Sequence, residues 1–181
     1  MFGLKRRVNL EKRLEIEPKR FDTVLLIDMQ ESFLKNINPQ ERGVIIAAQM
    51  NVLGHCASHD IPLIALEYRL NGSTILTLKQ QIRRIPRHKY IIKNDDDGFY
   101  GSSCEELLKT LEEYQSNTLY LMGINASVCV KETGIGAVRN GFKIVTSNDV
   151  IADKETWGRI DPGWFKRNGV YVRDYNELTA F

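Results

Sequence analysis

Short, largely apolar runs alternate with longer stretches of helical periodicity along most of this 181-residue chain. Short runs that are apolar on both sides are typical of strands covered on both faces. Strands that alternate with helices form parallel sheets with helices on either side. We therefore predict an α/β protein with three layers, α-β-α, around a mainly parallel, doubly wound, Rossmann-like sheet. The predicted strands cover residues 23–27, 61–66, 89–92, 118–122, 142–146 and 170–172.

Two predicted helices begin with capping residues. Asn38 can accept hydrogen bonds from a first turn, Pro39 suits the first helical position, and Glu41 completes a capping box. Ser102 and Glu105 have the same spacing. They predict the start of a second capped helix.

Residues 1–20 are dense in charge and contain no apolar segment of the kind that a secretory signal needs. We interpret them as a charged N-terminal arm. The remaining length suits one domain with its own core, so residues 21–181 are predicted to form a single domain. No apolar run in the sequence approaches the roughly 20 residues that span a bilayer.

The charge balance and the cysteine content limit the class of partner. The 25 basic and 23 acidic residues leave a net charge of +2, which gives no electrostatic reason to expect nucleic acid or an anionic membrane. The three cysteines, Cys56, Cys104 and Cys129, fit neither a disulfide framework nor a zinc knuckle. Such sparse use is typical of a reducing compartment. We expect a soluble, cytoplasmic protein.

Three reactive side chains lie at the carboxyl ends of predicted strands, where sheets of this type form their sites. Asp28 and Lys93 follow the first and third predicted strands, and Cys129 lies in the first turn of a helix predicted over 127–140. A helix N-terminus and a nearby lysine both favour a thiolate, and a carboxylate can carry its proton. Taken singly, these residues could be a buried cysteine, a surface lysine and a turn aspartate. Their joint placement favours a catalytic site.

Three ordered motifs carry a resemblance to a known family. DMQESF at 28–33 matches the pattern D-x-Q-x-x-F, and KNDDDGFYGSS at 93–103 is a lysine segment. GINASVCVKETGIGAVRNGFKIVTSND at 123–149 matches G-x-x-x-x-x-C-V-x-x-T-x-x-x-A-x-x-x-G, followed by an apolar strand and an aspartate. Over roughly residues 23–153 the chain resembles the isochorismatase-like cysteine hydrolases.

This resemblance implies a fold, a reaction and a set of site residues. The fold would be the isochorismatase-like α/β fold, and the catalytic triad would be Asp28, Lys93 and Cys129. A non-proline cis peptide would lie at Ile124–Asn125, and the backbone N–H groups of Val128 and Cys129 would hold an oxyanion. The reaction would be hydrolysis of a C–N bond in an amide, ureido or carbamoyl group through a Cys129 thioester. The family also implies self-association, expected around the helix that follows Cys129.

The sequence lacks the metal site of the family's nicotinamidases, which place histidines after the second strand. That segment reads EYRLNGST at 67–74, and no histidine lies between His59 and His88. His55 and His59 have a spacing that can bind a metal, but only Asp60 offers a third ligand. We therefore predict no catalytic metal.

No other cofactor is predicted. GIGAVR at 134–139 lacks the third glycine of a dinucleotide motif and lies within a predicted helix rather than after a strand. Two alternative functions stay open: a catalytically silent binding or regulatory protein with the same fold, and isochorismatase-type vinyl ether hydrolysis. Cys129 favours amide-type chemistry over the vinyl ether reaction.

The substrate pocket is the least constrained part of the prediction, because its walls come from loops. The run Asp95–Asp97 is either a solvated loop or the source of a side chain that selects a cationic or hydrogen-bond-donating substrate. Cys104 is interpreted as structural. The pocket candidates, each of which could instead be a packing or surface residue, are Phe33, Tyr68, Arg69, Asp97, Phe99 and Tyr100.

Overall fold

The computed structural model describes residues 21–157 and 160–179, so the predicted N-terminal arm lies outside the described residues. A seven-stranded sheet forms the centre, with strand order β3-β2-β1-β4-β5-β7 and with β6 paired to β4. Every pairing between these strands is parallel, which confirms the predicted sheet. The strands are β1 (Phe21–Ile27), β2 (Leu63–Tyr68), β3 (His88–Lys93), β4 (Ser116–Ile124), β5 (Lys143–Ser147), β6 (Ile151–Ala152) and β7 (Val170–Val172).

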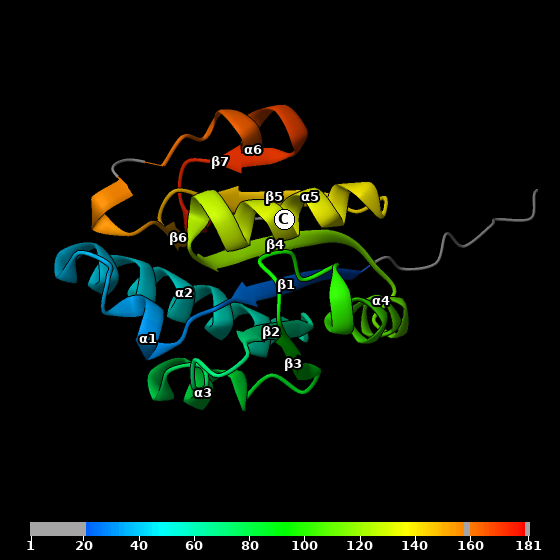
Figure 1. Cartoon of the computed structure of the whole chain (residues 1–181). Helices are drawn as coiled ribbons and strands as arrows, with labels where there is room; N and C mark the ends of the chain where they lie inside the picture. Colours follow the sequence, from blue (N-terminus) through cyan, green and yellow to red (C-terminus); the bar gives the residue numbers. More distant parts are fainter. Residues whose placement is uncertain (1–20, 158–159, 180–181) are drawn as a thin grey trace, which may run out of the picture.

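Helices cover both faces of the sheet and complete the three predicted layers (Figure 1). On one face α2 packs against α3 and α7, and on the other α5 packs against α6, while α4 contacts β4. In residues 21–157 and 160–179, every helix is too short or too polar to cross a membrane. The helices are α1 (Glu31–Leu34), α2 (Pro39–His59), α3 (Leu76–Ile82), α4 (Cys104–Glu113), α5 (Lys131–Arg139), α6 (Gly163–Asn168) and α7 (Tyr175–Leu178).

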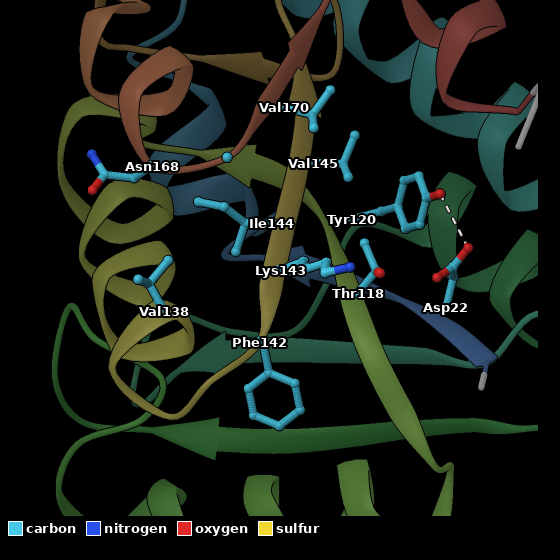
Figure 2. Close-up of a pocket in the computed structure, with 11 residues that line it drawn as sticks. Asp22, Thr118, Tyr120, Val138, Phe142, Lys143, Ile144, Val145, Asn168 and Val170 are labelled. Atoms are coloured by element: carbon cyan, nitrogen blue, oxygen red, sulfur yellow. Dashed lines mark hydrogen bonds between the residues drawn. The ribbon is translucent and has the colours of Figure 1, made fainter. Parts of the chain in front are cut away.

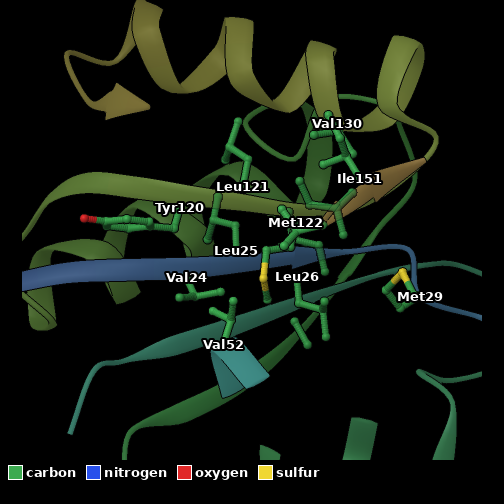
Figure 3. Close-up of a cluster of buried hydrophobic side chains, with 14 of the residues drawn as sticks. Val24, Leu25, Leu26, Met29, Val52, Tyr120, Leu121, Met122, Val130 and Ile151 are labelled. Carbon is green, nitrogen blue, oxygen red and sulfur yellow. The ribbon is translucent and has the colours of Figure 1, made fainter. Parts of the chain in front are cut away.

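The core is centred on β1 and β4, the two central strands (Figure 3). Leu25 and Leu26 of β1 lie beside Leu121 and Met122 of β4 in parallel register, and all four side chains are buried. Full burial of an aliphatic side chain of this size contributes about 1.5–3 kcal/mol. Because both faces of these strands are buried, their sequence is continuously apolar rather than alternating.

The predicted cap of the long helix α2 is confirmed. The Asn38 side-chain oxygen accepts hydrogen bonds from the backbone N–H groups of Gln40 at 2.9 Å and Glu41 at 3.4 Å, and Pro39 is the first helical residue. These bonds satisfy N–H groups that the first turn leaves without a helical acceptor. The helix ends at Asp60, whose left-handed backbone closes it.

The second predicted capping box is wrong. Ser102 lies inside a short 3-10 turn, Gly101–Ser103, and α4 begins only at Cys104. The Ser102 hydroxyl accepts a hydrogen bond from the Asn94 side chain at 2.7 Å, while the buried Ser103 hydroxyl donates to the Gly98 carbonyl at 3.0 Å. The hydroxyl groups of both serines are therefore hydrogen-bonded within the loop, and neither caps α4.

Candidate active site

The structure brings Asp28, Lys93 and Cys129 together at the carboxyl edge of the sheet. Asp28 directly follows β1 and Lys93 is the last residue of β3. The strand order places β2 between them, and the Asp28 N–H donates to the Leu66 carbonyl of that strand at 2.9 Å. Asp28 adopts a left-handed backbone with φ of 53°, which turns the chain away from the strand at this point.

Lys93 and Asp28 form a buried ion pair. Lys93 Nζ lies 2.9 Å from Asp28 Oδ2, and the two side chains are 0% and 1% exposed. The ammonium also donates to the backbone carbonyls of Asp95 at 2.9 Å and Asp96 at 3.5 Å, and it lies 4.5 Å from the centre of the Tyr68 ring. A buried lysine is tolerated only when its charge is compensated, and these contacts compensate it.

Burial raises the pKa of Asp28, and the Lys93 ammonium beside it offsets only part of that rise. A carboxylate with a raised pKa is a stronger base than an exposed one. Asp28 is therefore suited to accept a proton from a nearby acid.

The Cys129 side chain is 2% exposed, and its sulfur lies 3.4 Å from Asp96 Oδ1, to which the thiol donates. Burial raises the pKa of this thiol, the charge of Asp28 raises it further, and Lys93 lowers it. The sequence predicted a thiolate favoured by the helix N-terminus and the lysine. Lys93 does lower the pKa of the thiol, as predicted, but burial and the Asp28 carboxylate outweigh it, so the pKa of the resting thiol lies above its ordinary value.

The turn that carries Cys129 is held by close backbone packing. The predicted cis peptide is present at Ile124–Asn125. Gly123, just before it, has φ of 135°, and a Cβ there would lie 2.0 Å from the Ile27 carbonyl oxygen. No residue with a side chain fits this approach.

The chain then forms a π-helical turn, Ala126–Val130, before α5 begins at Lys131, so the helix predicted from residue 127 starts irregularly. The N–H of Val128 donates to the Asn125 carbonyl at 3.2 Å. Of the two predicted oxyanion donors, Val128 therefore already has an acceptor within the turn.

Two positioning interactions escaped the sequence-based prediction. The Asp153 carboxylate accepts hydrogen bonds from both the backbone N–H and the hydroxyl of Ser127, and so fixes the turn two residues before Cys129. Gln30 is fully buried, and its side chain bonds both backbone groups of Tyr68. Gln30 is the third residue of the DMQESF motif, so the motif itself could have indicated it. Asp153 follows β6, whose two residues are too few to show a strand pattern.

Only some of the predicted pocket residues lie near the triad. Tyr68 does, because its ring faces the Lys93 ammonium, and the Phe33 ring meets Tyr68 edge-on at 6.0 Å. Arg69 follows Tyr68 and is exposed, and Tyr100 is 65% exposed.

Phe99 and Asp97 belong to the packing of the loop rather than to the site. Phe99 is buried with its ring 5.8 Å from that of Phe142. The Asp97 carboxylate accepts a hydrogen bond from the Phe99 N–H at 2.8 Å and lies against Gly136 of α5. Among the three consecutive aspartates, the carboxylate at the thiol is Asp96, which the prediction did not single out, because loop positions have no periodicity.

Within the described part of the chain, no group of three or more metal-ligating side chains is placed to hold an ion. His55 and His59 stack on each other at 4.0 Å along α2. The segment 134–139 lies inside α5, where Gly134 packs against Trp164 of α6.

A cavity of about 510 Å³ lies at the opposite edge of the sheet, around the amino end of β5 (Figure 2). Its wall includes the apolar side chains of Val138, Val145 and Val170, and the Tyr120 hydroxyl donates to Asp22 at 3.1 Å beside it. Among the described residues that line it, none is a cysteine or a histidine. Asp28, Lys93 and Cys129 lie at the other, carboxyl edge of the sheet.

The fold and the site define an α/β protein with a cysteine, a lysine and an aspartate at the carboxyl edge of a parallel sheet. The model of the isochorismatase domain family matches residues 22–157. The chain belongs to this family.

Several solved structures share the fold. The MAR1 ribonuclease from Caenorhabditis elegans matches with a TM-score of 0.71 at 20% identity, over 88% of this chain and 79% of that one. The nicotinamidase SaPncA from Staphylococcus aureus matches with a TM-score of 0.70 at 21% identity, over 85% of this chain and 98% of that one. An N-carbamoylsarcosine amidase from Thermoplasma acidophilum matches with a TM-score of 0.67 at 20% identity, over 84% of this chain and 96% of that one. Comparison with curated protein sequences found no match.

Proposed function

We propose that this protein is a cysteine-dependent hydrolase that cleaves a C–N bond of a small molecule, in an amide, ureido or carbamoyl group. The observation that carries the proposal is the buried Lys93–Asp28 ion pair, 2.9 Å across, at the site of a buried cysteine thiol. A buried lysine and aspartate add little net stability compared with apolar side chains, so their presence beside a nucleophile favours a chemical role. Amidases among the structures of the same fold support the reaction class.

In the proposed cycle, Asp28 takes the thiol proton as the Cys129 sulfur attacks the carbonyl carbon of the substrate. The Cys129 N–H donates to the developing oxyanion. Asp28 then gives the proton to the leaving nitrogen, the C–N bond breaks, and a thioester remains on Cys129. Water attacks the thioester with Asp28 again as base, which releases the acid product and restores the thiol. Lys93 holds Asp28 in place and stabilises the negative charge that moves between carboxylate and sulfur.

The test is the loss of turnover in Cys129→Ala. Ammonia release from nicotinamide, N-carbamoylsarcosine and simple ureides is measured for the wild type, for Cys129→Ala, and for Cys104→Ala as the matched control. We expect the first substitution to abolish turnover and the control to retain it, since Cys104 opens α4 and has no part in the cycle. Wild-type activity in a folded Cys129→Ala protein would overturn the mechanism. A wild type inactive on every compound would instead favour a silent binding protein.

The assembly and the cellular setting belong to the same proposal. Cys56, Cys104 and Cys129 are all free thiols, which fits a reducing cytoplasm. Val138 on α5 and Val170 are exposed beside the apolar cavity of Figure 2, and we propose that this face takes part in a homo-oligomer. Sedimentation at micromolar protein should then show a species heavier than the 20.8 kDa chain. A monomer alone would contradict the proposed association.

A further inference from the structure

A second carboxylate lies against the nucleophile, in addition to Asp28. Asp96 Oδ1 accepts a hydrogen bond from the Cys129 thiol, with 3.4 Å between the sulfur and the oxygen. The backbone of the loop that carries Asp96 is held by Lys93, whose Nζ donates hydrogen bonds to the backbone carbonyls of Asp95 and Asp96. The lysine of the buried ion pair therefore contacts the backbone of the loop beside the thiol, although Asp96 itself is exposed at the surface.

The site has more acceptors than donors. The Lys93 ammonium has three N–H donors, and three oxygens surround it: Asp28 Oδ2 and the two loop carbonyls. It therefore has no donor left for an anionic substrate. In contrast, the buried Oδ1 atoms of Asp28 and Asn125 accept no hydrogen bond from the described residues. A buried acceptor without a donor is unfavourable, so a bound molecule that supplies N–H groups would be stabilised there.

The charges point the same way. Two carboxylates, Asp28 and Asp96, lie near the thiol, and the Lys93 ammonium forms its ion pair with Asp28. Tyr68 adds an aromatic face close to these groups, and its pKa is raised by burial and then by the charge of Asp96. An aromatic ring beside carboxylates is a favourable environment for a cationic nitrogen.

We propose that Asp96 is a specificity residue that makes this site select substrates with a positively charged nitrogen close to the scissile carbonyl carbon. The proposal rests on the hydrolase function above and names its substrate class. When the cationic nitrogen binds, it replaces the thiol as the partner of Asp96. The thiol is then free to give its proton to Asp28, so that substrate charge and activation of the nucleophile are coupled.

The neighbouring aspartate provides a matched control. Asp97→Asn changes the net charge of the protein by the same amount as Asp96→Asn, one residue away. However, the Asp97 carboxylate faces α5 and caps the Phe99 N–H, a contact that the asparagine oxygen can keep. A local effect of Asp96 on the thiol is thereby separated from an effect of overall charge.

The first experiment probes the thiol without any substrate. Cys129 is labelled with cationic 2-aminoethyl methanethiosulfonate and with anionic 2-sulfonatoethyl methanethiosulfonate. In each case the sulfur forms a disulfide with the reagent and methanesulfinate leaves. Labelling is read on the Cys129 peptide by mass spectrometry, because Cys104 is a second, partly exposed free cysteine. Each rate is divided by the rate of the same reagent with free 2-mercaptoethanol, which removes intrinsic reactivity.

The wild type should prefer the cationic reagent, and Asp96→Asn should reduce that preference about five-fold, as expected for loss of one partly screened charge at this range. Asp97→Asn should leave it unchanged. An equal change in both variants, or no change in Asp96→Asn, would overturn the proposal. Failure of both reagents to label Cys129 would also count against it, because a selective site must admit a molecule to the sulfur.

The second experiment uses three amides that differ mainly in charge: glycinamide, propionamide and malonamate, at about pH 7, where an α-amine is mostly protonated. We expect kcat/KM to fall in that order for the wild type, and Asp96→Asn to reduce the glycinamide-to-propionamide ratio about five-fold. Hydrolysis of the amides without a preference for glycinamide would refute the inference and leave the hydrolase function standing. Charge-selective labelling without hydrolysis of any amide would refute the hydrolase function and leave the charge preference standing.

Discussion

Replacing Lys93 by methionine tests whether the buried ion pair organises the site. Methionine fills a similar volume, so that the main change is the loss of the charge and its donors. The substitution leaves Asp28 without its cation at 0% exposure, and it leaves the Asp95 carbonyl without a donor that was 2.9 Å away.

The magnitude follows from the geometry. Two unit charges 2.9 Å apart attract each other by about 6 kcal/mol at an effective dielectric constant of about 20. Burying both ions costs several kcal/mol each, so the intact pair contributes little net stability. Removing one partner is different, because the other charge stays buried. We therefore expect Lys93→Met to lower the free energy of unfolding by about 3–5 kcal/mol.

The assay is urea unfolding, with a second lysine of the same strand as control. Lys89 is also in β3 and lies 3.0 Å from Glu106, but this pair is exposed, so Lys89→Met should cost under about 1 kcal/mol. Adding Asp28→Asn to Lys93→Met removes the uncompensated charge and should recover part of the loss. A cost for Lys93→Met no greater than that for Lys89→Met would refute the reasoning.

The loss should also depend on pH. Lys93 lowers a pKa of Asp28 that burial has raised, so its removal raises that pKa further. When the pKa of a group is higher in the folded protein than in the unfolded chain, its contribution to the free energy of unfolding is complete below the unfolded-chain pKa. That contribution is lost as the pH rises from the unfolded-chain pKa through the folded-state pKa. The destabilisation by Lys93→Met should therefore be larger at about pH 8 than at about pH 5, with a slope of at most about 1.4 kcal/mol per pH unit. The double variant should lose this dependence.

Three further predictions follow from the site and its surroundings. Asp28→Asn should lower the pKa of the Cys129 thiol and speed its alkylation by iodoacetamide near pH 7 while abolishing turnover, and slower alkylation would contradict this. Gly123→Ala, whose Cβ would meet the Ile27 carbonyl at 2.0 Å, should lower the free energy of unfolding by at least about 3 kcal/mol in thermal melts. By contrast, Gly43→Ala, in open space within α2, should raise it by about 0.5–1 kcal/mol. Turnover should survive exhaustive treatment with EDTA, and a loss that added zinc or iron restores would show that a metal is needed.

The fold was largely predictable because its strands are buried on both faces. The run predicted over 118–122 lies within β4, and the run over 89–92 lies within β3, with errors only at the ends. Strand β6 was missed because two residues cannot show a pattern. The start of α4 was misplaced because the Ser102 and Ser103 side chains form loop contacts that no local rule predicts.

The convergence of Asp28, Lys93 and Cys129 was predictable for a topological reason, since parallel strands bring their carboxyl ends to one edge. The raised pKa of the Cys129 thiol was not predictable, because it depends on how deeply the sulfur is buried and on which charge lies nearer. The role of Asp96 was also hidden, because nothing in a run of three aspartates shows which one turns toward the thiol. Asp153 acts across 26 residues on Ser127, a contact that only the folded chain creates.

The burial and the raised pKa of the Cys129 thiol have a consequence for the chemical durability of the protein. Oxidation of cysteine by peroxide starts from the thiolate and requires access to the sulfur. At rest, Cys129 meets both conditions poorly, since it is 2% exposed and burial raises its pKa. In the proposed cycle it becomes a thiolate only when substrate fills the site and Asp28 accepts the proton. Peroxide should therefore inactivate the working protein faster than the idle one, so that oxidative damage accumulates with the number of turnovers rather than with time.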